Sequence, residues 1–345
     1  MKCPHNFPSS LANGRSTLAV AVVLMLVTLV PAWSWGQALK KVPFPFSPIG
    51  INVLPWLVAK EAHIAERHGI DFDPVFIGAS AVLVQSMLSG AADFSGSGGP
   101  AIIANVLKGG DIIHITSMVP RFTQSIMVKP EIKRPEDLAG KKIGVSRLGT
   151  VTHFALQTAL DGYGVKNVTI LQMGGQPEEM TGLLRGVVDG AVLSPPYNFQ
   201  LKKQGYNELV SPSDLSKLGE FITNGITARR GVAEKDKETV YRVIKLTAES
   251  IKFIQTNRDA TKKIITKWMP LKDADLLEDL YRFATENYSK EGVTPEGALR
   301  SMAKQMAQSN LIDAKAAAAT PVTAYYDNRY VEDVKRSGFF EQLWR

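Results

Sequence analysis

The 345-residue sequence contains a single cysteine, Cys3. Because Cys3 precedes the longest apolar run, the chain from Leu39 onward has no thiol. This absence excludes disulfides, thiolate metal sites and cysteine nucleophiles from the body of the protein. It also argues against a lipoprotein anchor, since no cysteine follows the apolar run.

Metal-site spacings and nucleic-acid-binding patterns are missing as well. Basic residues do not cluster with aromatic residues, as they do on nucleic-acid-binding surfaces. The formal net charge of +7 at pH 7 therefore indicates a solvated surface with some bias toward small anionic ligands. We expect no metal, no cofactor and no nucleic-acid partner. The histidines beyond residue 38 show no spacing typical of a metal site; they are His63, His68, His114 and His153.

The apolar run, residues 18–30 (LAVAVVLMLVTLV), is shorter than the roughly 20 residues that span a bilayer. Lys2 and Arg15 precede it, and the small-x-small sequence GQA follows it at residues 36–38. This order is typical of a secretory signal peptide. We therefore predict that residues 1–38 are a cleavable signal peptide and that the mature protein is soluble in the periplasm. An uncleaved membrane anchor is the alternative.

The rest of the chain is long enough for two domains. From Val42 to about Ser211, short apolar runs alternate with helical stretches, which is typical of parallel βαβ units. Residues 42–48 (VPFPFSP) suit an edge strand at best, because of their prolines. Residues 53–67 have the apolar spacing of one amphipathic helix. After about Asn224 charged, periodic helices follow, and we expect them to pack on the first lobe.

One sequence motif occurs twice in the chain. Residues 88–100 read LSGAADFSGSGGP and residues 184–196 read LRGVVDGAVLSPP. In each copy a helix ends at a glycine, an aspartate follows three residues later, and a short strand leads to a loop with serine and proline. Such loops lie at the carboxyl ends of parallel strands, where open α/β sheets bind ligands. We predict one copy in each lobe; a chance recurrence of a common turn is the alternative.

Four passages carry a resemblance to a known family: PWLVAKEAHIAERHGIDF, GASAVLVQSMLSGAADF, RPEDLAGKKIGV and LLRGVVDGAVLSPPYNF. Their order and spacing resemble the periplasmic substrate-binding proteins of ABC importers of the nitrate, sulfonate and taurine group. That group includes the binders of thiamine pyrimidine precursors. The passages are distributed over most of the span of residues 42–205.

The resemblance implies a fold of the α/β class, the type II periplasmic-binding fold. Two α/β lobes would enclose a ligand cleft, with the C-terminal helices packed on lobe 1. The implied bounds are residues 39–125 and 225–345 for lobe 1 and residues 126–224 for lobe 2. The two crossings would fall near Gln124–Val128 and Thr223–Thr227. Closure of the lobes on ligand is the hinge motion known for periplasmic binding proteins as a class.

The function implied is that of a receptor and not of an enzyme. It would capture a small organic molecule, such as a sulfonate or carboxylate, and deliver it to an ABC permease in the inner membrane, acting as a monomer. One alternative is an enzyme on the same fold, resembling the lyases of alternative menaquinone synthesis. The export signal and the lack of a paired acid and base at cleft positions speak against it. Another alternative is the binding component of a sensor or of a non-ABC carrier.

The sequence also departs from the family. Many members carry Glu-Pro or Asp-Pro after the second Gly-x-x-Asp strand, whereas this chain has Ser194-Pro195-Pro196-Tyr197. An acidic contact for a cationic ligand is therefore missing at this loop. The cysteine cluster of the pyrimidine-synthesising relatives is also absent.

The candidate ligand contacts are loop amides and helix N-termini, which suit anionic groups. The sequence offers three such starts, at residues 78–80, 97–99 and 149–152. Capping and turn formation are the alternative roles of these small residues. By family position, the expected polar contacts are Ser97, Gly98, Gly149, Thr150 and Ser194.

Five further residues complete the candidate site. Arg121 could hold an anion with its guanidinium group, although a surface or hinge role is the alternative. Trp56 and Tyr197 could stack on a planar ligand, and the core is the alternative for Trp56. His153 lies one turn into a helix that should face the cleft, so it could contact the ligand; a structural histidine is the alternative. Ser47 follows the first strand, where a turn role competes.

Overall fold

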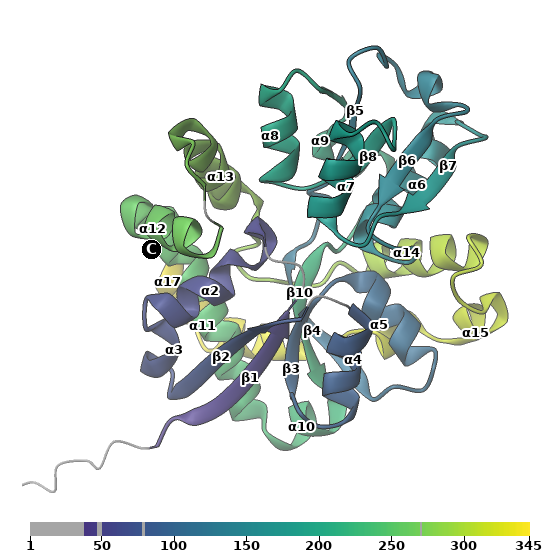
Figure 1. Ribbon diagram of the computed structural model, residues 1–345. Helices are drawn as coiled ribbons and strands as arrows, with labels where there is room; N and C mark the ends of the chain where they lie inside the picture. The colour runs from purple at the N-terminus through teal and green to yellow at the C-terminus, as the bar shows by residue number, and fades with distance from the viewer. Residues whose placement is uncertain (1–37, 47–49, 78–79, 270) are drawn as a thin grey trace, which may run out of the picture. The chain divides into compact units, whose positions relative to one another are not determined.

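The computed structural model describes residues 38–46, 50–77, 80–269 and 271–345 (Figure 1). The chain divides into two units, Met1–Ala38 and Leu39–Arg345, and the description below concerns the second unit. Apart from Ala38, the predicted signal peptide lies outside the described residues and stays a prediction. Within those ranges, no helix is long and apolar enough to cross a membrane.

Two five-stranded sheets organise the unit, and both have the same plan. In each sheet three parallel strands lie side by side, and a fourth strand pairs antiparallel with the last of them. A fifth strand pairs antiparallel with the other edge of the fourth. The first sheet has the order β2-β1-β3-β10-β4, with β1 Lys40–Phe46, β2 Ile70–Phe76, β3 Phe94–Ser97, β4 Ile112–Val119 and β10 Asn224–Arg229. The second sheet has the order β7-β6-β8-β5-β9, with β5 Ser125–Val128, β6 Lys142–Val145, β7 Thr169–Gln172, β8 Gly190–Leu193 and β9 Asn207–Val210.

We call the first sheet with its helices lobe 1 and the second sheet with its helices lobe 2. The helices of the first half of the chain are α2 Leu54–Glu61, α3 Ile64–Arg67, α4 Ser80–Leu88, α5 Gly99–Val106, α6 Val151–Tyr163, α7 Gln176–Leu184, α8 Tyr197–Lys203 and α9 Pro212–Leu218. The C-terminal helices are α10 Arg230–Lys235, α11 Lys237–Thr256, α12 Arg258–Trp268, α13 Ala274–Asn287, α14 Glu296–Gln308, α15 Ala314–Ala319, α16 Arg329–Arg336 and α17 Phe339–Trp344. Short 3-10 turns occur at Ile51–Val53, Pro135–Leu138 and Val322–Ala324.

Two local predictions were wrong. β1 is an inner strand and not an edge strand. The carbonyl of its last residue, Phe46, accepts a hydrogen bond from the Ile77 N–H beside β2. Because the backbone polar groups of successive strand residues point to opposite sides, the backbone nitrogens of Pro43 and Pro45 face β3. Pairing with β3 is limited to Phe46, and the missing proline N–H groups therefore cost little. The helix predicted over residues 53–67 is split by His63, which has a left-handed φ of 52°.

The repeated sequence motif is confirmed as a pair of helix-to-strand turns, one in each lobe. Gly90 follows α4 with a φ of 79°, and Gly186 follows α7 with a φ of 72°; both are left-handed angles that suit glycine. The aspartates that follow hold the scaffold together. Asp93 pairs with Arg229 at 3.1 Å. Asp189 contacts the Lys129 ammonium at 2.7 Å.

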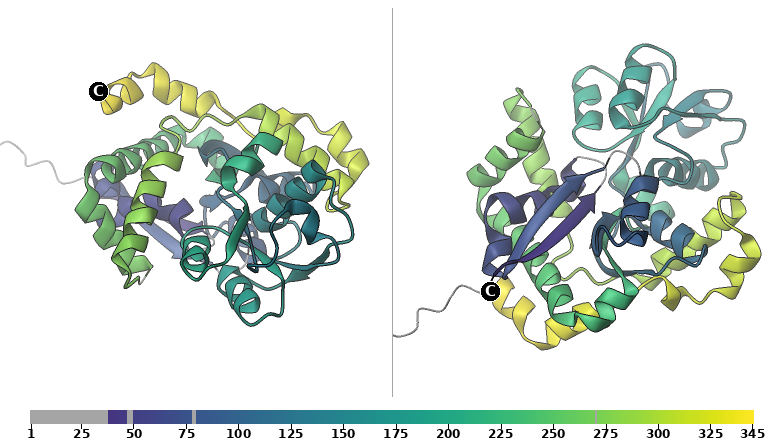
Figure 2. Two further views of the ribbon diagram at one scale, coloured as in Figure 1. Left: turned by 90° about the horizontal axis from the view of Figure 1, so that it is seen from above. Right: turned by 60° about the horizontal axis from the view of Figure 1, so that its bottom comes forward.

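The C-terminal helices pack mainly on lobe 1, as predicted. Figure 2 shows the last, yellow helices α16 and α17 beside the first sheet, where both contact α11 and α16 also contacts β4. The second hydrophobic core joins the lobes, because it combines Ile103 of α5 and Met302 of α14 with Phe154 of α6. The packing between the lobes therefore includes α14 as well as the two sheets' own helices.

Candidate functional site

The chain passes between the two sheets twice. The first crossing lies between the end of β4 at Val119 and the start of β5 at Ser125, and the second lies between Leu218 of α9 and the start of β10 at Asn224. Both crossings therefore come a few residues earlier than the segments predicted for them. The predicted bounds of the lobes, residues 39–125 with 225–345 and residues 126–224, stay a prediction.

Two aromatic rings hold the crossings against each other. Phe122 and Phe221 stack with ring centroids 4.4 Å apart and planes inclined by 11°. Both rings are buried, and Phe154 of α6 lies 6.2 Å from Phe221. The stacked rings thus join the two crossings.

A polar cluster lies beside the two crossings and connects the lobes. Asn52 of lobe 1 donates from Nδ2 to the Thr123 hydroxyl at 3.0 Å. Gln124 donates from Nε2 to the same hydroxyl at 3.0 Å and to Ser194 Oγ at 3.3 Å. Gln176, at the start of α7, accepts from the Ser194 N–H at 2.7 Å through Oε1. Ser194, a predicted contact, is thereby held by the side-chain amides of Gln124 and Gln176, which come from two separate segments.

Sequence reasoning missed the other members of this cluster. Asn52, Thr123 and Gln176 follow no spacing that links them, because the crossings bring them together only in three dimensions. The preference of proline for position N2 of a helix marks Gln176 as a helix start, which does not indicate a ligand contact.

Ser97 and Gly98 lie where β3 meets α5. Ser97 is 8% exposed, and its hydroxyl lies 2.6 Å from the Thr227 hydroxyl of β10. A Cβ atom at position 98 would lie 2.7 Å from the carbonyl oxygen of Thr223 and 3.3 Å from Cγ2 of Val151 in lobe 2. Gly98 is therefore the point at which the backbone of lobe 1 approaches the first residue of α6.

The start of α5 offers fewer free amides than the sequence indicated. The Gly99 N–H donates to the carbonyl of Ile222 at 3.1 Å, and the next residue, Pro100, has no N–H. The predicted helix start at residues 78–80 cannot be assessed, because positions 78 and 79 lie outside the described residues.

The start of α6 is more open. Thr150 is the N-cap, and its hydroxyl donates to the Arg147 carbonyl at 2.7 Å. The N–H of Gly149, which has a φ of 78°, donates to His153 Nδ1 at 3.3 Å. Among the described residues, no acceptor is found for the N–H groups of residues 151–153. Because helix N-termini carry partial positive charge, these amides could hold an anionic group.

His153 and Tyr197 border the same region. His153 is buried against Phe154, and burial lowers its pKa, so the imidazole is neutral at pH 7. Tyr197 begins α8 after a cis Pro195-Pro196 bond and is half-buried. Burial, together with the nearby charge of Glu178, raises the pKa of its phenol. A Cβ at Gly50 of lobe 1 would lie 3.7 Å from the Pro195 carbonyl, so this loop also faces lobe 1.

Trp56 and Arg121 do not join the polar cluster. The Trp56 ring is fully buried, 4.7 Å from the Phe44 ring, and fills the space that a Cβ at Gly96 would need. Arg121 is exposed at a crossing and contributes only its carbonyl, which accepts from the Thr223 hydroxyl at 2.6 Å. Ser47 lies outside the described residues. Ligand contacts by these three residues stay predictions.

A buried carboxyl group lies behind the start of α6. Glu179 of α7 is fully buried and accepts from the Ser146 hydroxyl, while its Oε2 has no partner among the described residues. The Ser146 N–H in turn donates to the Thr152 hydroxyl at 2.9 Å. Burial raises the pKa of Glu179 well above its usual range and so favours the protonated, uncharged form. In the sequence, the pair Glu178-Glu179 resembles the exposed, acidic start of a helix. The sequence therefore gives no sign that Glu179 is buried.

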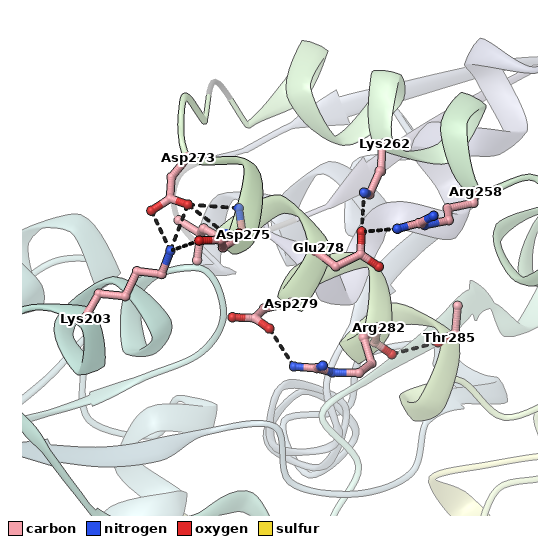
Figure 3. Close-up of polar contacts among 10 residues, drawn as sticks. Lys203, Arg258, Lys262, Asp273, Asp275, Glu278, Asp279, Arg282 and Thr285 are labelled. Carbon is pink, nitrogen blue, oxygen red and sulfur yellow. Dashed lines mark hydrogen bonds and ion pairs between the residues drawn. The ribbon is translucent and has the colours of Figure 1, made fainter.

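Charged residues connect the lobes at the outer surface (Figure 3). Lys203 of α8 contacts the two carboxylate oxygens of Asp273, the N-cap of α13, at 2.8 and 2.7 Å. The Lys203 ammonium also lies 3.7 Å from Asp275. Next to this ion pair, Phe199 of α8 and Phe283 of α13 meet edge to face, 6.0 Å apart. Helix α13 thus extends from lobe 1 to lobe 2.

The described part of the chain contains no group of three His, Cys, Asp or Glu side chains that could hold a metal ion. The candidate site is therefore built from hydroxyl, amide and backbone N–H groups. Such groups bind and orient a ligand by hydrogen bonds.

Comparison with known proteins agrees with this arrangement. Residues 51–261 match a family model described as NMT1/THI5 like. A binding protein of Brucella abortus (strain 2308) is 27% identical over 224 residues, which cover 64% of this chain and 68% of that protein. The taurine-binding periplasmic protein of Escherichia coli (strain K12) is 26% identical over 213 residues, which cover 59% of this chain and 66% of that protein.

Solved structures of similar fold include two binding proteins. The periplasmic aliphatic sulphonate binding protein of Escherichia coli has a TM-score of 0.68 at 20% identity, covering 79% of this chain and 94% of that chain. The periplasmic nitrate-binding protein of Synechocystis PCC 6803 has a TM-score of 0.69 at 10% identity, covering 87% of this chain and 89% of that chain. These similarities confirm the predicted fold, with two α/β lobes.

Proposed function

The chain belongs to the NMT1/THI5 like family, and we propose that it is a periplasmic receptor that captures a small organic anion and delivers it to an ABC permease. The observation that carries this proposal is the open start of α6. Its free N–H groups lie next to Gly98 of lobe 1, where the two lobes meet. An anion held by these amides would be enclosed when the lobes close.

The surrounding charges support an anion. Burial favours the neutral form of Glu179, the carboxyl group behind the amides. The loop at Ser194–Tyr197 has no carboxylate that could attract a cation. The names of the relatives point the same way, since they describe binders of taurine, sulphonates and nitrate. We therefore place sulfonates first and carboxylates second among the candidate ligands.

The remaining parts of the proposal rest on the family. The relatives are named as binding proteins, which supports a receptor without catalytic activity, and several are described as periplasmic. The signal peptide predicted at residues 1–38 supports export. Neighbouring genes for an ATPase and a permease would support the ABC assignment, whereas neighbouring genes for a sensor kinase or a tripartite carrier would contradict it.

The proposal is tested by isothermal titration of the purified protein with taurine, alkanesulfonates, nitrate and aromatic carboxylates. We expect binding near the micromolar range, about −8 kcal/mol. The diagnostic variant is Val151→Pro, which removes one N–H at the first helical position, where proline is tolerated. Thr150 already has the extended backbone that precedes a proline, with a ψ of 170°.

The matched control is Val151→Ala, which loses the side chain but keeps the N–H. We expect Val151→Pro to lower the affinity about tenfold or more relative to Val151→Ala, because a hydrogen bond to a charged group contributes about 1.5–3 kcal/mol. Equal affinities of the two variants would contradict the role of the α6 amides. No binding of any member of the panel would contradict the receptor function, and turnover of a bound ligand would contradict its non-catalytic nature.

A further inference from the structure

A chain of hydrogen bonds runs through the interior of lobe 1 and ends at Ser97. Ser97 Oγ lies 2.6 Å from Thr227 Oγ1, which lies 3.4 Å from His114 Nδ1. His114 Nε2 lies 2.9 Å from Ser117 Oγ, and the Ser117 hydroxyl donates to Thr294 Oγ1 at 3.1 Å. Ser97 is 8% exposed and the other four residues are more deeply buried. The chain is therefore shielded from water except near Ser97.

The sheet brings these side chains together. β10 lies between β3 and β4, and it pairs Gly225 with Ser97 and Thr227 with His114. A register shift in the pairing of β4 with β10 lies between Ile226 and Thr227, and Ser117, three residues beyond His114, contacts the His114 ring. Gly225 leaves room for that ring, because a Cβ there would lie 2.5 Å from its Cε1.

The direction of this hydrogen-bond chain, meaning which group donates at each step, follows from the number of protons available. Ser117 uses its single hydroxyl proton on Thr294, so it can only accept from His114 Nε2–H. A neutral imidazole with its proton on Nε2 leaves Nδ1 as an acceptor, so the Thr227 hydroxyl donates to Nδ1. Thr227 then has no proton for Ser97, and the Ser97 hydroxyl must donate to Thr227.

The imidazole remains neutral, as this scheme requires. Burial lowers the pKa of His114 to about 3, because no charged group compensates for the loss of water. Above that pH only one ring nitrogen carries a proton, and the direction of the chain is retained.

We propose that His114 and Ser117 act as positioning residues that make Ser97 a hydrogen-bond acceptor toward the ligand, so that the site selects organic anions that also carry a hydroxyl or amino donor. This inference rests on the proposed function. Ser97 is next to Gly98, at the meeting point of the lobes and across from the α6 amides. The anionic group would bind at α6, and a donor group on the same molecule would reach Ser97.

The direction of the chain is tested without ligand by NMR of the ¹⁵N-labelled protein. The His114 ring should show a protonated Nε2 and a bare Nδ1 between neutral pH and mildly acidic pH. The ring signals are assigned from the signals that disappear in His114→Gln. A proton on Nδ1, or a ring that titrates near its usual pKa of 6.5, would overturn the proposal.

Selectivity is tested by titration with 2-hydroxyethanesulfonate, ethanesulfonate and 2-fluoroethanesulfonate. Fluorine is close in size to a hydroxyl group but cannot donate. We expect the wild type to bind the hydroxyl compound at least about fivefold more tightly than the fluoro compound. In the fluoro complex two acceptors, Ser97 Oγ and the fluorine atom, would face each other. In Ser117→Ala, His114 can take either tautomer and Ser97 can also donate. This preference should then fall to about twofold or less, with ethanesulfonate binding unchanged.

The matched control is Ser250→Ala, another buried serine, whose hydroxyl bonds only within α11, to the Leu246 carbonyl. It should keep the wild-type preference. Binding of the three sulfonates without preference for the hydroxyl compound would contradict this inference alone. Failure of all three to bind, together with the rest of the titration panel, would contradict the proposed function, and the NMR result would still establish the direction of the chain.

Discussion

The ammonium group of Lys203 contacts both carboxylate oxygens of Asp273, and this ion pair joins α8 of lobe 2 to α13, which is carried by lobe 1 (Figure 3). The pairing raises the pKa of Lys203 and lowers the pKa of Asp273, so both groups are charged over the physiological range. Residues 70 positions apart in the chain are thus held together.

The first prediction concerns this ion pair. Lys203→Met should favour the open arrangement of the lobes and lower ligand affinity about two- to fivefold, as expected for an exposed pair. The effect should be clear at about 0.1 M salt and nearly absent at about 1 M salt, where charges are screened over about 3 Å. Titration and small-angle scattering at both salt concentrations measure it.

Lys202→Met is the control, because Lys202 pairs with Glu208 within lobe 2 at 2.9 Å. It should leave both affinity and scattering unchanged. An equal effect of the two substitutions would show that general surface charge, and not the bridge between the lobes, is responsible.

The second prediction concerns the close approach at Gly98. Gly98→Ala should lower the free energy of unfolding by about 1–3 kcal/mol, because the new Cβ meets a backbone carbonyl that cannot turn aside. Urea denaturation measures this change. Gly231→Ala is the control, since its Cβ would lie an ordinary 3.6 Å from Asp111. Wild-type stability of Gly98→Ala would mean that the lobes separate easily at this point.

The third prediction concerns Glu179. Its pKa in the folded state is raised above the usual 4.5, so the folded protein holds a proton that the unfolded chain releases. Stability should therefore decrease as pH rises above about 4.5, by up to about 1.4 kcal/mol per pH unit, until the folded-state pKa is passed. Glu179→Gln, which resembles the protonated acid, should remove this decrease in urea denaturation curves. Glu178→Gln should retain it, and a persistent decrease in Glu179→Gln would contradict the assignment.

The fourth prediction concerns His114 and acid. Because the folded-state pKa is about 3 and the usual value is 6.5, the unfolded chain binds a proton that the folded protein excludes. Stability should fall as pH drops below 6.5 toward 3, by up to about 1.4 kcal/mol per pH unit. His114→Gln should show a smaller loss between pH 6.5 and pH 4. His63→Gln, at a side chain that is 81% exposed, should behave as wild type.

Local patterns were enough to predict the two-lobed α/β plan and several polar residues near the junction. The turns at Gly90 and Gly186 were predictable because left-handed backbone angles favour glycine wherever they occur. Ser97 and Ser194 were named by family position, and both follow the two turns along the chain. The apolar alternation of the strands and the spacing of the helices are properties of neighbouring residues.

The tertiary structure alone decided which groups meet. Thr123 and Gln124 contact Asn52 and Ser194 only because the chain crosses between the sheets. His114 reaches Thr227 because β10 returns, more than one hundred residues later, to lie between β3 and β4. The protonation of Glu179 is likewise set by burial, which depends on packing by distant segments. Hydrogen bonding, burial and pKa depend on distances in space, and a sequence records only distances along the chain.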